Sequence, residues 1–323
     1  MNNIQQYAIG VDIGGTNTKY GIVNHRGVIS HNGRLSTAEY ATAEAFVEAL
    51  YAALEPSIEE VGKQHIKGIG IGAPNANYFT GSIEHAPNLN WKGIVPFANM
   101  ISEKFGLPCS ITNDANAAAV GEMTYGAGRG MNDIIVITLG TGVGSGIVAG
   151  GHLIYGHDGF AGELGHTIIR PGGRKHWSTG LCGSLEAYAS ATGIAITAKE
   201  MLAEAKSPSL LHEYPLEAID SKAVFECAQK GDALAKEVYR FTGQILGESL
   251  ANFVMFSSPE AIILFGGVTK AGDMIMQPVR EHMEKNLLPV FRNKVLLTFS
   301  ELHEADAAIL GASALVWAMK LKS

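Results

Sequence analysis

Short apolar runs that end in glycine recur along the chain. The run Tyr7–Ile13 leads into two consecutive glycines and is followed at once by a second run, Lys19–Val23. The same pattern returns where Ile134–Leu139 leads into alternate glycines and Ser145–Ala149 follows. Apolar runs on either side of a glycine turn predict β-hairpins. One hairpin in each half of the chain favours two related domains, and chance reuse of a common hairpin is the alternative.

The remaining apolar patterns predict both strands and helices. Runs typical of strands are Ile66–Ile71, Cys109–Thr112, Ala261–Phe265 and Val295–Phe299. Spacing of three and four residues predicts helices within Phe46–Leu54, Leu234–Phe253 and Ala307–Lys320. Strands that alternate with helices indicate an α/β fold with mixed sheets. The repeat alone places the domain boundary near residue 116, so we expect domains of residues 1–116 and 117–305.

Composition and charge exclude several classes of protein. The 323 residues include 46% hydrophobic and 17% charged residues, which is a globular composition. Lys and Arg number 24 against 31 Asp and Glu, a net charge of −7 without basic runs, so we expect no nucleic-acid partner. Glycines interrupt the uncharged stretch 134–151, and the N-terminus does not resemble a secretion signal, so we expect no membrane partner. Three scattered cysteines favour a reducing, cytoplasmic location.

The two glycine turns are candidate phosphate sites. In the first turn, Asp12 precedes Gly14, Gly15, Thr16 and Asn17. Backbone N–H groups of adjacent glycines can surround an anion, Thr16 adds a hydroxyl, and Asp12 could orient a water on Mg²⁺. The second turn contains Gly140, Thr141 and Gly142, and Gly266–Gly267 follows a later strand, where a purine could lie against the backbone. A lone turn of this kind is usually structural, but the pair resembles a two-sided phosphate clamp.

Asp114 is the candidate catalytic group. It lies between a short strand and an alanine-rich helix, which is an N-cap position. One interpretation is therefore a capping aspartate. The other is a general base that accepts a hydroxyl proton during phosphoryl transfer, with Asn113 holding a neighbouring hydroxyl.

These motifs, in this order, resemble the ROK family of sugar kinases and regulators. The resemblance covers nearly the whole chain and rests on Asp12–Asn17, Asn88–Trp91, Asn113–Ala118, Leu139–Ser145, Gly162–His166, Gly183–Glu186 and Gly266–Gly267. It implies an actin-like ATPase fold of two ribonuclease-H-like domains with an interdomain cleft, in which helix 306–323 is added to the first domain, and a homodimer. We expect hexose binding to close that cleft. It also implies that ATP and Mg²⁺ are used to phosphorylate a hexose.

The resemblance further assigns roles to single residues. Asp114 would accept the proton of the sugar 6-hydroxyl. The remaining hydroxyls would be bound by Asn88, Asn113, Glu163, His166 and Glu186. For His166 the alternative is a core histidine, and for Glu186 an exposed helix residue. Glucose is the expected substrate; N-acetylglucosamine, mannose and fructose are alternatives.

A zinc site found in many family members is missing its ligands here. The family's three cysteines correspond to Trp177, Thr179 and Ser184, which cannot act as thiolates. We therefore expect no bound metal at this position and a loop, residues 172–183, held by packing, with Trp177 filling the space. An irregular site made from His166, His176 and Cys182 is the alternative.

Two other function classes are weighed against the kinase. Regulators of this family carry a DNA-binding segment of about 80 residues ahead of the first glycine turn, whereas 11 residues precede Asp12 here. We therefore expect an enzyme rather than a regulator. A non-catalytic sugar-binding protein is also less favoured, because Asp114 and both glycine turns are present.

Overall fold

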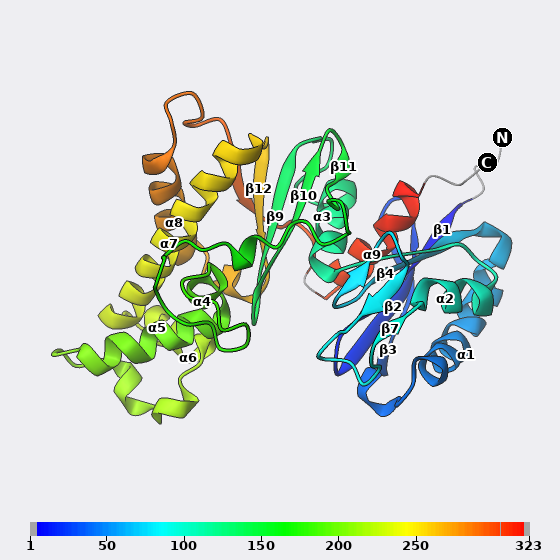
Figure 1. Ribbon diagram of the computed structural model, residues 1–323, viewed down its shortest axis with the longest axis horizontal. Coiled ribbons are helices and arrows are strands. Elements are labelled where there is room, and N and C mark those ends of the chain that lie inside the picture. The colour runs from blue at the N-terminus through cyan, green and yellow to red at the C-terminus, as the bar shows by residue number, and fades with distance from the viewer. Residues whose placement is uncertain (1–4, 304, 320–323) are drawn as a thin grey trace. The chain divides into compact units, whose positions relative to one another are not determined.

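The first sheet combines a hairpin with parallel strands. The computed structural model describes residues 5–303 and 305–319. Its first sheet contains β1 (Tyr7–Ile13), β2 (Asn17–Asn24), β3 (Ile29–Ser36), β4 (Ile66–Gly72) and β8 (Cys109–Thr112). The order is β3-β2-β1-β4-β8, in which the first three strands are antiparallel and β1, β4 and β8 are parallel (Figure 1). The carboxyl ends of β1, β4 and β8 therefore lie at one edge.

A second sheet repeats this order. It contains β9 (Ile134–Leu139), β10 (Val143–Ala149), β11 (His152–Leu153), β12 (Ala261–Phe265) and β13 (Leu296–Phe299), arranged β11-β10-β9-β12-β13. The strands β9, β12 and β13 are parallel, and β10 and β11 are antiparallel. Each sheet thus places its third, second, first, fourth and fifth strands side by side. The mixed α/β class and the duplicated hairpin predicted from the sequence are both confirmed.

The other elements surround these sheets. A small antiparallel sheet contains β5 (Ala76–Asn77), β6 (Ser82–Glu84) and β7 (Ile94–Val95). The α-helices of the described chain are α1 (Ala43–Val61), α2 (Phe97–Phe105), α3 (Asp114–Tyr125), α4 (Glu186–Ala189), α5 (Ala191–Glu204), α6 (Ser221–Gln229), α7 (Ala233–Ser257), α8 (Asp273–Asn286) and α9 (Ala307–Ala318). None of the helices in that part of the chain is both long and apolar enough to cross a membrane.

The chain forms two compact units. The first unit contains the described residues up to Asn132, the segment Gly146–Gly162 and the described residues from Ser300 onward; the second contains Asp133–Ser145 and Glu163–Phe299. The boundary expected at residue 116 falls inside α3. This helix lies in the first unit because it packs closely on α9: a Cβ added at Gly121 would lie 2.8 Å from Gly311 Cα. Residues 320–323 of the expected last helix lie outside the described residues.

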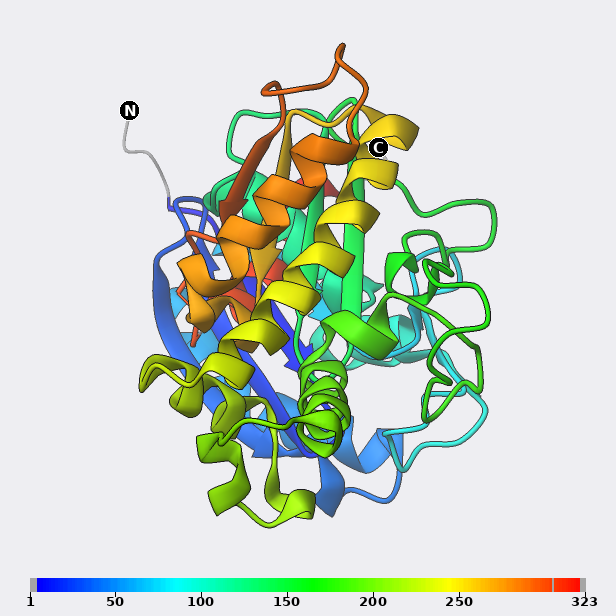
Figure 2. The same ribbon diagram turned by 90° about the vertical axis from the view of Figure 1, so that its left-hand side faces the viewer.

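Close backbone contacts hold α9 against the first sheet. A Cβ added at Gly10 would lie 2.1 Å from Ile309 O, and one at Gly70 would lie 1.9 Å from Ala312 O. Only glycine permits this approach. In the second unit α7 and α8 lie side by side, and a Cβ added at Gly247 would lie 2.4 Å from Val279 O (Figure 2). Both units therefore provide rigid supports for the turns that follow β1 and β9.

Candidate active site

Two carboxylates lie together at the edge of the first sheet. Asp12 is the penultimate residue of β1 and is paired in register with Gly72 at the end of β4. A Cβ added at Gly72 would lie 3.7 Å from Asp114 Cα and 3.8 Å from Asp12 Oδ1. Glycine at this position leaves room for both acidic residues. The structure thus brings together the candidate general base and the candidate Mg²⁺-orienting group, which are 102 positions apart in the sequence.

The environment of Asp12 disfavours its charged form. Burial, and then the charge of Asp114, raise the pKa of Asp12 to about 6, and Lys19 opposes them. Lys19 is the register partner of Asp12 across the β1–β2 hairpin. A divalent cation would favour the ionised form of both carboxylates, and oxygen ligands are the type that Mg²⁺ prefers. The donor set therefore fits Mg²⁺, with Asp12 as the residue that would hold it.

The helix α3 is capped by a different residue from the one predicted. The N-cap is Asn113, whose side-chain oxygen accepts a hydrogen bond from Asn116 N at 2.7 Å. Asp114 is the first helical residue, and its Oδ1 accepts from Ala115 N at 2.9 Å. The N-cap interpretation of Asp114 is therefore wrong. Asp114 is exposed, and its second carboxylate oxygen is available for a substrate hydroxyl. The side-chain oxygen of Asn113 is used by the cap, so its amide N–H groups remain as hydrogen-bond donors.

The first glycine turn packs on the segment that contains Asn88. Gly14 N donates to Asn17 O at 3.0 Å, which closes the turn, and Thr16 O accepts from Thr37 N at 2.9 Å. A Cβ added at Gly15 would lie 2.6 Å from Asn88 O. The structure therefore places a candidate sugar ligand directly beside the candidate phosphate turn.

In the second unit, the turn after β9 is held by residues around α4 and α5. Gly140 N donates to Gly142 O at 3.0 Å, and Gly140 O accepts from Ala191 N at 2.8 Å. Thr192 Oγ1 donates to Thr141 O at 3.0 Å. These bonds fix the turn and use the N–H of Gly140, so its candidate phosphate donors are the N–H groups of Thr141 and Gly142.

This turn opens onto a pocket of about 530 Å³ within the second unit. Gly140 and Gly267 both line it, and a Cβ added at either would meet no atom within 4 Å. The other glycines of the described chain with such open space have positive φ. Neither backbone geometry nor packing therefore accounts for glycine at 140 and 267, but a ligand lying against the backbone would. A purine nucleotide fits a pocket of this size.

The rest of the pocket was not predicted from the sequence. Its far side is formed by α6 and α7 through Ser221, Lys222, Phe225, Glu226, Gln229 and Tyr239. Burial raises the pKa of Tyr239 to about 12, so its phenol stays a hydrogen-bond donor. The apolar spacing of α6 resembles that of an ordinary amphipathic helix, and no local motif marks these residues. Gly266, in contrast, has a structural role: its φ is 109°, and a Cβ there would lie 2.6 Å from Leu139 O.

The three sugar-ligand candidates of the second unit lie at the ends of two short helical segments. Glu163 precedes the 3₁₀ turn Leu164–His166, and His166 Nε2 lies 3.9 Å from Glu163 Oε2. The Nδ1 atom of His166 is buried and has no hydrogen-bond partner among the residues that the structure describes. Glu186 is the first residue of α4, half-buried, and its Oε2 accepts from Val143 N at 2.6 Å. His166 and Glu186 are thus positioned by elements next to the 140–144 turn.

The loop at 172–183 is not filled by Trp177. The Trp177 side chain is 45% exposed, while the neighbouring His176 is 1% exposed. His176 turns inward to hydrogen-bond within the loop, and Trp177 stacks on its outer face with ring centroids 4.1 Å apart. The expectation for Trp177 is therefore wrong, because the imidazole nitrogen can accept hydrogen bonds from the loop's backbone N–H groups, whereas an indole is a donor only.

Zinc content tests the missing ligand set directly. Within the described residues, no group of three or more His, Cys, Asp or Glu side chains could hold a metal ion, and His166, His176 and Cys182 are not gathered into one. We expect the purified protein to contain less than about 0.1 zinc per chain, because thiolates are absent from positions 177, 179 and 184. Elemental analysis by mass spectrometry measures this ratio, and one zinc per chain would contradict the expectation.

Comparisons with known proteins agree with this geometry. The model of the ROK family matches residues 8–319. The chain is 36% identical to a glucokinase of Halalkalibacterium halodurans, over 96% of this chain and 95% of the relative, and 33% identical to a glucokinase of Thermotoga maritima, over 95% and 96%. A ROK family glucokinase from Streptomyces griseus, solved in complex with glucose and AMPPNP, superimposes with a TM-score of 0.77 at 33% identity, covering 97% of this chain and all of the other. With the fold and its matching motifs in agreement, the chain belongs to the ROK family.

Proposed function

We propose that this protein is an ATP-dependent hexokinase that phosphorylates the 6-hydroxyl of glucose. The observation that carries the proposal is the pair Asp12 and Asp114, converging over Gly72 beside a glycine turn. One carboxylate that can receive a proton and a second that fits Mg²⁺ are what phosphoryl transfer to an alcohol requires. The glucokinase relatives and the nucleotide-sized pocket of the second unit support the same reaction.

The first unit supplies the acid–base group. The free oxygen of Asp114 accepts the proton of the sugar 6-hydroxyl. At the same time the hydroxyl oxygen forms a bond to the γ-phosphorus of ATP, and the bond from that phosphorus to the leaving ADP breaks. The alanine N–H that binds the other Asp114 oxygen fixes the direction of the carboxylate. Mg²⁺ bound with the triphosphate would supply charge neutralisation, and Asp12 would hold it.

Hydroxyl recognition is assigned to five side chains. Asn88 and Asn113 would contribute from the first unit, and Glu163, His166 and Glu186 from the second. Amide, imidazole and carboxylate groups together offer both donors and acceptors, which a sugar's hydroxyl groups require in pairs. The same groups could serve N-acetylglucosamine, mannose or fructose, and a comparison of these hexoses tests the preference for glucose.

Steady-state kinetics with a panel of hexoses test the proposal. ADP release should depend on the hexose and on Mg²⁺, and kcat/KM should be highest for glucose. The product should carry phosphate at the 6-position, which phosphorus NMR identifies. A higher kcat/KM for another hexose would change the substrate, whereas sugar binding without ADP release would indicate a non-catalytic regulator.

Filling the space beside Gly267 should block the nucleotide without affecting the sugar. Gly267→Val places a branched side chain in the pocket, so we expect KM for ATP to rise by at least about 10-fold, the effect of losing one good contact. Gly267→Ala should have a smaller effect in the same direction. Because no protein atom lies within 4 Å of the added Cβ, the melting temperature should not fall. Unchanged KM for ATP in both variants would place the nucleotide elsewhere.

A further inference from the structure

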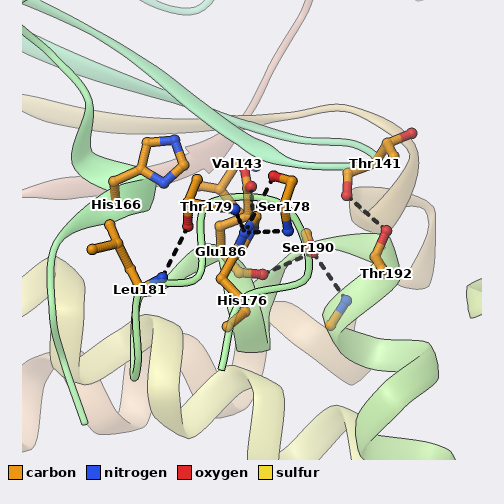
Figure 3. A network of polar contacts seen from close by, with 12 residues as sticks. Thr141, Val143, His166, His176, Ser178, Thr179, Leu181, Glu186, Ser190 and Thr192 are labelled. Atoms are coloured by element: carbon orange, nitrogen blue, oxygen red, sulfur yellow. Dashed lines mark hydrogen bonds and ion pairs between the residues drawn. The ribbon is translucent and has the colours of Figure 1, made fainter. Parts of the chain in front are cut away.

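His176 forms the centre of a hydrogen-bond network in the loop that lacks zinc ligands. Its side chain is 1% exposed, and its Nδ1 accepts from the backbone N–H groups of Ser178 at 3.2 Å and Thr179 at 3.1 Å (Figure 3). Two backbone N–H groups of the loop thus donate to the same imidazole nitrogen. Loss of this acceptor would remove the hydrogen-bond partner of both N–H groups.

These two donors determine where the imidazole proton lies. A nitrogen that accepts from two N–H groups cannot carry a proton itself, so the neutral ring of His176 is protonated at Nε2. Nε2 lies 2.6 Å from Glu186 Oε1. The contact is therefore a directed hydrogen bond from the imidazole to the carboxylate, with its direction set by the loop backbone.

The carboxylate of Glu186 is also held from its other side. Its Oε2 accepts from Val143 N at 2.6 Å, and a Cβ added at Gly142 would lie 2.4 Å from the same oxygen. One donor at each oxygen leaves each with further acceptor capacity, since an ionised carboxylate offers about four lone-pair sites. With its side chain 14% exposed, Glu186 can accept from two donors of a ligand, such as neighbouring hydroxyls of a sugar.

We infer that His176 is a positioning residue that aims Glu186 at the hexose hydroxyls and, with one imidazole, organises the backbone of the loop at 172–183. The inference rests on the proposed function, because it takes Glu186 as a sugar ligand. The network joins the loop, Glu186 and the 140–144 turn through successive hydrogen bonds, all within the second unit. The imidazole acts through Glu186 and does not itself touch the substrate.

Two isosteric substitutions separate positioning from simple loop stability. His176→Gln places an amide donor near the Nε2 position and loses the Nδ1 acceptor, whereas His176→Asn keeps an acceptor near Nδ1 and does not reach Glu186. His176→Ala removes both functions. Leu181→Ala is the control, because its side chain belongs to the same loop and is 45% exposed. Glucose affinity by titration calorimetry, KM and kcat for glucose, and melting temperature are measured for each.

If His176 positions Glu186, glucose affinity should depend on a hydrogen-bond donor at the Nε2 position. His176→Ala and His176→Asn should weaken glucose binding by about 10- to 100-fold, the usual cost of a lost hydrogen bond to a charged group, with kcat falling less than KM rises. His176→Gln should recover most of the affinity, and Leu181→Ala should match the wild type. If His176→Asn binds glucose as well as or better than His176→Gln, or if His176→Ala binds like the wild type, the inference is wrong.

A spectroscopic measurement does not depend on the variants folding. Nitrogen-15 NMR of the labelled wild-type protein distinguishes the two imidazole tautomers, and we expect His176 to be protonated at Nε2. The Nδ1–H tautomer would overturn the inference even if every substitution unfolds the chain. Failure of the proposed function looks different: the wild type itself would neither bind nor phosphorylate any hexose, and the positioning role would fall with it.

Discussion

Replacing Asp114 by asparagine is expected to reduce kcat by about 10²- to 10⁴-fold, the range for loss of a general base. Asparagine keeps the shape of the side chain and an acceptor for Ala115 N, so the start of α3 should be preserved. The amide cannot take up the hydroxyl proton at neutral pH, so the loss should fall on the chemical step. KM for glucose should change by less than about threefold, since one hydrogen-bond acceptor remains.

The matched control for this variant is Glu44→Gln. Glu44 is also an acidic residue in the first turn of a helix, α1, and it is exposed and distant in sequence from the site motifs. It reports the general effect of removing a first-turn carboxylate, which is a few tenths to about 1 kcal/mol in stability. Glu44→Gln should leave kcat unchanged. Turnover by Asp114→Asn within tenfold of the wild type would contradict the assignment of the base.

Replacing Asp12 by asparagine should impair catalysis and stabilise the protein at the same time. The variant loses the carboxylate that fits Mg²⁺, so we expect kcat to fall by about 10²- to 10³-fold, as for the loss of one preorganised electrostatic group. The folded-state pKa is raised from 3.8 to about 6. The folded state therefore favours protonated Asp12. Above pH 6, ionisation of this buried carboxyl beside Asp114 lowers the free energy of unfolding of the wild type. Asparagine removes this loss, which is at most about 3 kcal/mol.

The pH dependence of unfolding gives the sign of this effect. As pH rises from about 4 to about 6, the folded wild type keeps a proton on Asp12 that the unfolded chain has already released, so its stability decreases through that window. The metal-free variant should lack this decrease and should melt at a higher temperature than the metal-free wild type at pH 7.5. Calorimetry at several pH values measures both. A lower melting temperature for Asp12→Asn at pH 7.5 would mean that ionised Asp12 is favoured in the fold.

The glycine turns and strands were predictable because their signals are local. β1, β8, β9 and β12 begin and end where the apolar runs do, since a buried strand followed by a tight turn requires that order of residues. The N-cap of α3 was assigned one residue too late. Asn113 and Asp114 are both common helix-start residues, and only the path of the chain after β8 decides which of them bonds to the helix backbone.

Sequence by itself determined the α/β class, the duplicated hairpin and the candidate groups, because periodicity and motif order are properties of neighbouring residues. Tertiary structure decided how distant groups combine. The approach of Asp12 to Asp114 depends on Gly72 in a third segment, and the pocket beside Gly267 depends on the packing of α6 and α7. It also decided that His176, rather than Trp177, turns into the loop at 172–183. The loop's N–H groups and the half-buried Glu186 carboxylate both bond to the His176 ring, and only the folded chain shows which side chain reaches both.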